Sequence, residues 1–302
     1  YAALGASPAE AASALFAVSL GTGLLTMLLS ARARLPVTIA WSTPGAALLI
    51  ATGLPEGGFP VAVGAFLVTA LLLVVAGLVK PFGRAVAAIP KPLASAMLAG
   101  VLLELCLAPM QAVGEQPALA LPIIFAWALT LRFARLYAVP VAVAVTAIVI
   151  AYAVDLPPDA LAGGWPHPVL IAPAFTLQAL IGIAVPLFIV TMASQNVPGL
   201  AVMNANGYTL NPSPVFVATG ITSALIAPFG GHSVNLAAIT AALCAGPEAH
   251  PDPGRRWIAS LAFGVGFLVL AASASFAAAF IAAAPPLLIQ AAAGLALLST
   301  LA

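Results

Sequence analysis

Charged side chains are scarce in this sequence. Asp, Glu, Lys and Arg make up 6% of the 302 residues, and hydrophobic residues make up 63%. A soluble domain has about 25% charged residues. With so few charges, the chain cannot form a protein whose whole surface is exposed to water. Together with a mean hydropathy of +1.17, they indicate an all-α polytopic membrane protein.

Several motifs are also missing, and each absence excludes a class of function. The sequence has no His-Glu-x-x-His motif, no Gly-x-Ser-x-Gly motif, no nucleotide-binding P-loop and no zinc spacing of Cys and His. Its two cysteines, Cys106 and Cys244, lie in or beside apolar segments, so buried free thiols are expected. We therefore expect no enzyme, no ATP-driven pump within this chain, no metal and no cofactor. The lack of a basic patch argues against a nucleic-acid partner.

Long apolar runs predict about eleven membrane segments, since a spanning helix needs about 20 such residues. The segments are expected at residues 11–30, 37–53, 60–79, 88–108, 118–131, 136–154, 174–193, 212–228, 233–245, 257–284 and 285–302. The chain starts at Tyr1 without a methionine and stops at Ala302 inside apolar sequence. We interpret it as a fragment of a longer membrane protein.

The positions of the charges support this segment count. If every segment reverses direction, all nine Lys and Arg residues fall on one side of the bilayer: Arg32, Arg34, Lys80, Arg84, Lys91, Arg132, Arg135, Arg255 and Arg256. The opposite side then receives Glu10, Glu56, Glu115, Asp155 and Asp159. By the positive-inside rule the basic side is cytoplasmic.

Two polar, small-residue stretches open directly into apolar runs. They are Trp41-Ser42-Thr43-Pro44-Gly45-Ala46-Ala47-Leu48 and Gly231-His232-Ser233-Val234-Asn235-Leu236-Ala237-Ala238. Thr43 suits a helix N-cap and Pro44 the first helical position, and Ser233 is predicted to cap in the same way. Each stretch therefore predicts a half-helix that begins inside the membrane, where transporters build binding sites. Helix N-termini favour a negatively charged ligand.

A weak internal repeat relates these two regions. Leu15-Phe16-Ala17-Val18-Ser19 resembles Val215-Phe216-Val217-Ala218-Thr219, and each run leads through a Gly/Thr-containing helix to one of the polar breaks. The first helix would run inward and the second outward. The order therefore predicts an inverted repeat, which is typical of secondary transporters.

A third polar cluster and two ionisable residues are further candidates. Ser194-Gln195-Asn196-Val197-Pro198-Gly199 is predicted to break the membrane segment, with amides that donate to a carboxylate; the alternative is an interfacial loop. His232 either carries a proton during transport or is a neutral, packed histidine. Glu104 is either part of a site or a solvated residue near the outer interface. Ser42 and Thr43 can cap the helix and line the site at once.

Several motifs resemble the benzoate/proton symporter (BenE) family over essentially the whole chain. They are Ala40-Trp41-Ser42-Thr43-Pro44-Gly45-Ala46-Ala47-Leu48, Val190-Thr191-Met192-Ala193-Ser194-Gln195-Asn196-Val197-Pro198-Gly199, Ala238-Ile239-Thr240-Ala241-Ala242, Pro247-Glu248-Ala249-His250-Pro251-Asp252 and Ala293-Gly294-Leu295-Ala296-Leu297-Leu298-Ser299-Thr300. The family looks like the seven-plus-seven inverted-repeat transporters, which include nucleobase and ascorbate carriers. The resemblance implies that the chain holds about eleven of fourteen segments. It also implies a substrate-carrying core at about 9–80 and 174–284 and a gate at about 84–156 and 285–302, within one transporter unit spanning 1–302.

The resemblance further implies a multi-pass protein of the bacterial inner membrane that imports benzoate with a proton, as the core moves against the gate. The expected partners are benzoate, a proton, the lipid bilayer and a second copy in a homodimer. Another organic anion or a nucleobase as substrate, or an anion channel, are the alternatives. The related nucleobase carriers have carboxylates near the breaks where this chain has Gln195 or Asn196, and His232, which suits an anionic substrate.

The expected substrate site combines the two breaks with the third polar cluster. It comprises Ser42, Thr43, Pro44, Gly45, Ser194, Gln195, Asn196, Gly231, His232, Ser233 and Asn235. His232 is the candidate for proton coupling. Trp41, Phe188 and Phe229 are the candidates for an apolar wall against the benzoate ring.

Overall fold

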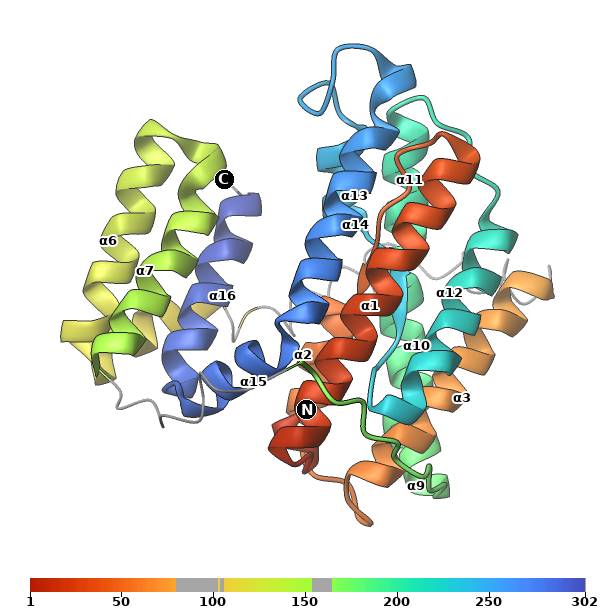
Figure 1. Cartoon of the computed structure of the whole chain (residues 1–302), viewed down its shortest axis with the longest axis horizontal. Coiled ribbons are helices and arrows are strands. Elements are labelled where there is room, and N and C mark those ends of the chain that lie inside the picture. Colours follow the sequence, from red (N-terminus) through yellow and green to blue (C-terminus); the bar gives the residue numbers. More distant parts are fainter. Residues whose placement is uncertain (80–102, 104–105, 154–164, 302) are drawn as a thin grey trace. The chain divides into compact units, whose positions relative to one another are not determined.

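The computed structural model describes residues 1–79, 103, 106–153 and 165–301 (Figure 1). The chain forms two compact units. Unit 1 combines Tyr1–Leu98 with Gly164–Ser275, and unit 2 combines Ala99–Gly163 with Phe276–Ala302. Among the described residues, five helices are long and apolar enough to cross a membrane, and all five lie in unit 1. The predicted segment 88–108 and its Glu104 lie largely outside the described residues.

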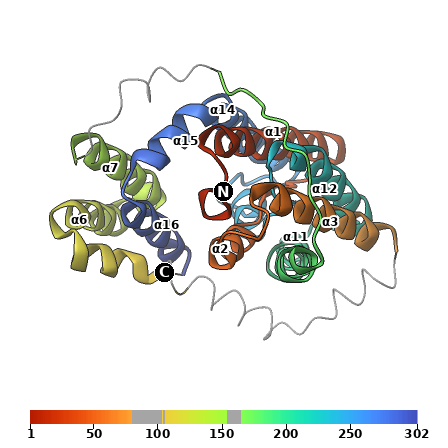
Figure 2. The same cartoon turned by 90° about the horizontal axis from the view of Figure 1, so that it is seen from below.

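Unit 1 is built from long helices that pack side by side (Figure 2). They are α1 (Pro8–Ala33), α3 (Phe59–Leu78), α12 (Pro212–Ile226), α14 (Trp257–Ala272) and the long helix Leu177–Ala205. Glycine allows two of these pairs to approach closely. A Cβ on Gly23 of α1 would lie 2.8 Å from the Gly264 carbonyl of α14, and one on Gly220 of α12 would lie 2.7 Å from the Val74 nitrogen of α3. Small residues at helix contacts are typical of packing inside membranes.

Two further segments of unit 1 begin as strands and continue as short helices. Strand β1 (Ile39–Trp41) leads into α2 (Thr43–Thr52), and strand β2 (Val234–Leu236) leads into α13 (Ala238–Ala245). Both breaks were predicted from the polar stretches. The series α1–β1–α2 and α12–β2–α13 have the same order and run in opposite directions, as an inverted repeat requires.

The predicted break at residues 194–199 is wrong. The helix runs without interruption from Leu177 to Ala205 as α9 (Leu177–Ala179), η3 (Leu180–Ala184), α10 (Val185–Thr191), η4 (Met192–Asn196) and α11 (Val197–Ala205). Both η3 and η4 are π-helical turns, and a proline follows two residues after each, at Pro186 and Pro198. In an α-helix a proline ring clashes with the carbonyl four residues earlier. The wider turn relieves this clash, so the helix continues where the sequence suggested a loop.

Arginines gather at one end of unit 1, and Glu10 lies at the other end. Because α1 and α14 are antiparallel, the end of α1 with Arg32 and Arg34 lies beside the start of α14 with Arg255 and Arg256 (Figure 1). Glu10 lies in the first turn of α1, at the other end. This is the separation that the alternating charges predicted for these residues.

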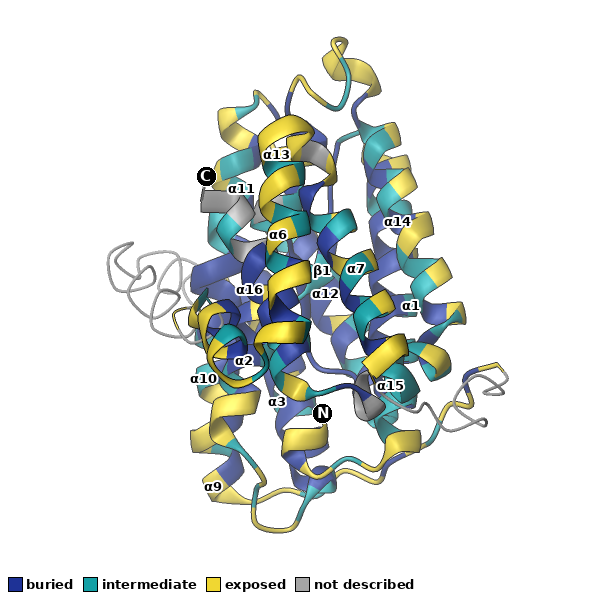
Figure 3. Ribbon diagram, turned by 90° about the vertical axis from the view of Figure 1, so that its left-hand side faces the viewer, coloured by how far each residue is buried: buried dark blue, intermediate teal, exposed yellow. Residues whose placement is uncertain are grey.

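Unit 2 contains α6 (Pro117–Phe133), α7 (Ala138–Ala153) and α16 (Pro286–Leu301), which pack around Ile123, Ile150 and Leu288. The predicted single segment 257–284 is instead two helices, because α14 ends at Ala272 and α15 (Ala274–Ala283) follows. Many positions of α6 and α14 are exposed (Figure 3), as expected of helices that face lipid. Both cysteines are free; Cys244 is buried and Cys106 is half-buried.

Candidate functional site

The two strands meet in the interior of unit 1 as an antiparallel pair. Ile39 lies opposite Leu236, Ala40 opposite Asn235, and Trp41 opposite Val234. The Ser42 N–H donates to the Ser233 carbonyl at 3.2 Å, and the Ala237 N–H donates to the Thr38 carbonyl at 2.9 Å, which extends the pair at both ends. Unpaired backbone in a membrane is tolerated only where it is buried in protein or lines a cavity. Pairing the two breaks with each other satisfies this requirement.

Hydroxyl groups of the preceding long helices hold the strands in place. On the β1 side, Thr26 Oγ1 of α1 accepts from the Ile39 N–H at 3.0 Å and donates to the Ile39 carbonyl at 3.1 Å. On the β2 side, Ser223 Oγ of α12 accepts from the Val234 N–H at 3.0 Å. In both halves of the repeat, a hydroxyl group of the preceding long helix thus forms a hydrogen bond with the strand backbone.

Ser42, and not Thr43, is the N-cap of α2. Its Oγ accepts from the Gly45 N–H at 3.1 Å, while Thr43 and Pro44 occupy the first two helical positions. The predicted cap is wrong by one residue, because proline is equally accommodated at the second position, where no N–H is needed for the helix. Ser42, Pro44 and Gly45 are buried, and the Thr43 side chain is exposed.

The predicted cap by Ser233 is also wrong. Helix α13 begins at Ala238, after β2, and its N-cap Ala237 offers no side-chain acceptor. The acceptors come from the π-helical turn η4 instead. Gln195 Oε1 accepts from the Ala238 N–H at 3.2 Å, and Asn196 Oδ1 accepts from the Leu236 N–H at 2.8 Å. Two predicted site residues therefore meet the second break, through contacts that the sequence did not reveal.

A cluster of hydroxyl groups joins the two breaks to the long helix Leu177–Ala205. Thr191 Oγ1 lies 3.0 Å from Ser42 Oγ and 3.2 Å from Ser233 Oγ, and all three side chains are fully buried. The Asn235 amide completes the junction, with its oxygen 3.1 Å from the Ser42 N–H. Thr191 was not predicted. The signal was present, since Thr191 lies four residues before Gln195 on the same helix.

His232 lies beside this junction in an aromatic environment. Its Nδ1 is 2.7 Å from the Tyr1 hydroxyl, and the Phe66 ring lies with its centroid 6.4 Å from the imidazole. The side chain is 5% exposed, and its Nε2 has no hydrogen-bond partner among the described residues. Tyr1 is a second residue that sequence reasoning missed. Gly231 is buried at the turn before β2, and Ser194 Oγ is buried and also has no partner in the described part of the chain.

The three aromatic candidates for a ring-binding wall lie in different places. Trp41 packs edge-on against Phe267 of α14, with ring centroids 5.2 Å apart. Phe188 is buried in the core of unit 1, and Phe229 lines a groove between α1 and α12. Although they come from different elements, Trp41 and Phe229 both pack against the buried cluster that contains Phe188.

No carboxylate is buried at the junction within the described residues. The one buried charged side chain among them is Arg256, whose guanidinium donates to the carbonyls of Ala245 and His250 at 2.8 Å each. Arg256 thus caps a carbonyl at the C-terminal end of α13, whereas Gln195 caps an N–H at its N-terminal end. The junction itself offers neutral hydroxyls, amides and two helix N-termini, which suit an anion.

Comparisons with known proteins identify the family. A family model described as benzoate membrane transport protein (BenE) matches residues 1–302. The inner membrane protein YdcO of Escherichia coli is 40% identical over 297 residues, which cover 98% of this chain and 76% of that protein. The benzoate membrane transport protein of Acinetobacter baylyi is 30% identical over 289 residues, which cover 95% of this chain and 73% of that protein.

A solved structure shares the fold. The transmembrane domain of the cyanobacterial bicarbonate transporter BicA matches with a TM-score of 0.63 at 18% sequence identity, over 98% of this chain and 85% of that one. The match confirms the predicted all-α polytopic transporter fold. The matching family consists of membrane transport proteins and not of enzymes, in agreement with the missing catalytic motifs.

Proposed function

The chain belongs to the BenE family of benzoate membrane transport proteins, and we propose that it imports benzoate together with a proton across the bacterial inner membrane as a secondary active transporter. One observation carries the proposal: β1 and β2 pair in the interior of unit 1, and each leads into a half-helix that begins there. Discontinuous helices whose N-termini meet at mid-depth are the recurring substrate site of secondary transporters.

The benzoate carboxylate would bind between the first turns of α2 and α13. Both helix ends carry partial positive charge, and the side chains around them are neutral. Thr43, at the first position of α2, is exposed and therefore free to reach a ligand. Ser194 adds a buried hydroxyl that has no partner in the described part of the chain.

Transport would occur by alternating access between the two units. All the candidate site residues belong to unit 1, which we assign as the substrate-carrying core, and unit 2 would serve as the gate. The basic end of unit 1, with Arg32, Arg34, Arg255 and Arg256, would face the cytoplasm under the positive-inside rule. This assignment places Glu10 on the periplasmic side.

His232 is the proposed proton carrier. The Tyr1 hydroxyl at 2.7 Å can donate to Nδ1 of a neutral His232 and can accept from it once the ring is protonated. In either state Nε2 remains without a partner among the described residues, so it is available to a carboxylate. A protonated imidazole next to the site would attract the benzoate carboxylate. Protonation of His232 would therefore be coupled directly to benzoate binding.

The test is uptake of radiolabelled benzoate by the full-length protein in proteoliposomes, with and without an inward proton gradient. The variant is His232→Gln, and the matched control is His250→Gln, since His250 lies in an exposed loop and its side chain bonds only backbone groups of Asp252. We expect gradient-driven accumulation in the wild type and the control. In His232→Gln we expect benzoate exchange without accumulation.

Other outcomes lead to different functions. Accumulation that survives His232→Gln would keep the symporter and reject this histidine as the carrier. Counterflow that responds to another organic anion or a nucleobase, and not to benzoate, would change the substrate. Flux without counterflow or accumulation would indicate an anion channel.

A further inference from the structure

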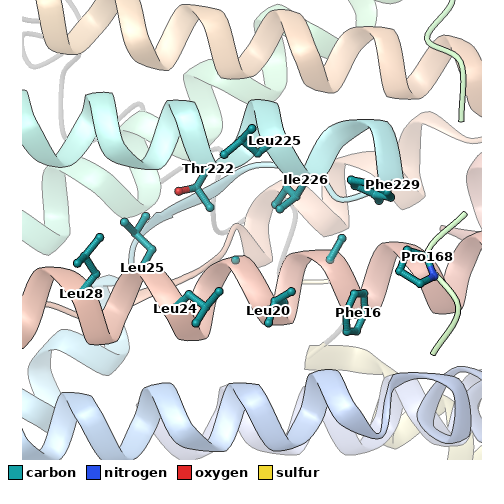
Figure 4. Close-up of a pocket in the computed structure, with 12 residues that line it drawn as sticks. Phe16, Leu20, Leu24, Leu25, Leu28, Pro168, Thr222, Leu225, Ile226 and Phe229 are labelled. Atoms are coloured by element: carbon teal, nitrogen blue, oxygen red, sulfur yellow. The ribbon is translucent and has the colours of Figure 1, made fainter. Parts of the chain in front are cut away.

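An apolar groove runs along the outer face of unit 1 between α1 and α12 (Figure 4). It has a volume of about 450 Å³ and extends from Phe16 to Leu28 on α1. Leu225 of α12 and Phe229 of the following 3-10 turn η5 (Ala227–Phe229) form the opposite wall, and Pro168 lies at one end. This groove is separate from the junction of the two breaks, and the proposed transport function does not use it.

The groove is open and its walls are hydrophobic. Leu24 is 52% exposed, Leu28 is 62% exposed and Leu225 is 67% exposed. Thr222 provides the only polar side chain among the residues that line it. Gly21 makes the groove deep on the α1 side, because a Cβ there would lie 3.0 Å from Ile226. In a membrane, such a surface is in contact with hydrocarbon.

The length of the groove matches one lipid leaflet. Phe16 and Leu28 are twelve positions apart, which at a rise of about 1.5 Å per residue gives about 18 Å along α1. One leaflet contributes half of a hydrocarbon core that is about 30 Å thick. A single acyl chain therefore fills the groove end to end.

A basic residue lies on the same helix face just beyond the groove. Arg32 follows Leu28 by four positions, so it lies one turn further along the same face of α1. Its side chain is exposed, and no carboxylate among the described residues forms an ion pair with it. Because α1 and α12 are antiparallel, the first turn of α12 lies at the same end and adds a partial positive charge.

We propose that this groove binds one anionic phospholipid from the leaflet at the basic end of unit 1, with an acyl chain between α1 and α12 and its phosphate at Arg32. The guanidinium pairs with a phosphate through two parallel hydrogen bonds. The apolar walls take up the chain. The occupant is a lipid rather than a protein segment because Arg32 lies at the depth of the lipid headgroups. The groove begins one helical turn from it and is as long as one acyl chain.

The test uses the full-length protein, released from bilayers that contain equal amounts of phosphatidylglycerol and phosphatidylcholine, with native mass spectrometry to measure the lipid that stays bound. Arg32→Gln removes the phosphate contact, and Leu28→Trp obstructs the groove. The matched controls are Arg135→Gln in unit 2 and Leu71→Trp on α3, whose leucine is 58% exposed outside the groove.

We expect the wild type and both controls to retain phosphatidylglycerol in preference to phosphatidylcholine. Arg32→Gln should lower that preference about fivefold, the factor for one basic residue at an anionic membrane surface. Leu28→Trp should lower retention of both lipids. Equal retention by Arg32→Gln and Arg135→Gln would overturn the proposal, as would equal retention of the two lipids by the wild type.

Cross-linking identifies any other occupant of the groove. In a background without Cys106 and Cys244, Leu28→Cys would form a disulfide-linked dimer if a second copy covered the groove. Paired with Phe125→Cys on α6, it would form an internal cross-link if unit 2 did. Either product in intact membranes would overturn the lipid assignment. If the lipid proposal is overturned, the expected benzoate uptake is unaffected. Lipid binding in the groove and benzoate transport are therefore tested independently.

Discussion

The half-helices α2 and α13 begin in the same buried layer of unit 1, but their first N–H groups are satisfied in different ways. In α2 the acceptor is Ser42, three residues before the Gly45 that it caps. In α13 the acceptor is Gln195, which is 43 positions away along the chain from Ala238. The first cap is local and the second depends on the position of another helix.

This difference separates what each break can do. Helix α2 keeps its cap wherever the helix Leu177–Ala205 moves, because Ser42 and Gly45 belong to one turn. Helix α13 loses its cap if the π-helical turn η4 shifts. Such turns are frequent at functional sites because they place side chains off the regular helical spacing. In the proposed transport mechanism, the second break is therefore the half of the site that substrate binding would couple to movement.

The largest effect is expected from a charge at the long-range cap. Gln195→Glu keeps an acceptor for the Ala238 N–H, so we expect the fold to persist. A carboxylate there repels a bound benzoate, and like charges in one site cost several kcal/mol, so the apparent affinity should fall by at least about tenfold. The concentration dependence of benzoate uptake measures this. Gln178→Glu, at an exposed position, is the control and should leave the affinity unchanged; equal affinities in both variants would contradict an anion site at α13.

Removing the other long-range acceptor should destabilise the protein. Asn196→Leu leaves the buried Leu236 N–H without its partner, which costs about 1–3 kcal/mol of the free energy of unfolding. Thermal unfolding of the purified protein in detergent reports the loss. Asn204→Leu, at an exposed site on α11, should change stability by less than about 0.5 kcal/mol. If Asn196→Leu leaves the stability unchanged, β2 does not depend on this hydrogen bond.

The local cap is tested by filling the space next to it. A Cβ on Gly45 would lie 2.6 Å from Leu187 Cδ1 and 2.7 Å from Ser42 Oγ, so Gly45→Ala should cost about 2 kcal/mol through overpacking. In Gly182→Ala the new methyl group has no atom within 4 Å. That control should be neutral or slightly stabilising, since alanine favours helix. Thermal unfolding again gives both values, and equal shifts would contradict a tightly packed first break.

The smallest effect comes from comparing the two serines directly. Ser42→Ala and Ser233→Ala each remove one hydroxyl contact with Thr191, but only Ser42 also caps a helix. Ser42→Ala should therefore be the more destabilising by about 1 kcal/mol, the usual value of an N-cap. If thermal unfolding shows the two variants to be equal, the local cap contributes nothing measurable.

Much of the fold was predictable because it depends on local composition. The run predicted at 118–131 corresponds to α6 (Pro117–Phe133), and the run at 60–79 corresponds to α3 (Phe59–Leu78). Apolar stretches of this length have few alternatives in a bilayer. The errors fall at prolines and caps: Pro198 follows a π-helical turn instead of starting a loop, and α13 starts five residues after Ser233. Proline and serine are each compatible with more than one backbone conformation, and packing against neighbouring helices determines which conformation forms.

Most residues that meet at the junction of the two breaks were named from the sequence, but the contacts between them were not. Composition by itself determined that the chain is a membrane protein, and the polar breaks determined where its helices are interrupted, because transfer into lipid penalises each unpaired group locally. Only the tertiary structure decided that β1 pairs with β2, that Gln195 caps α13, and that Tyr1 meets His232 across 231 positions. Those contacts join residues far apart in the chain, and each is formed only when separate helices pack together.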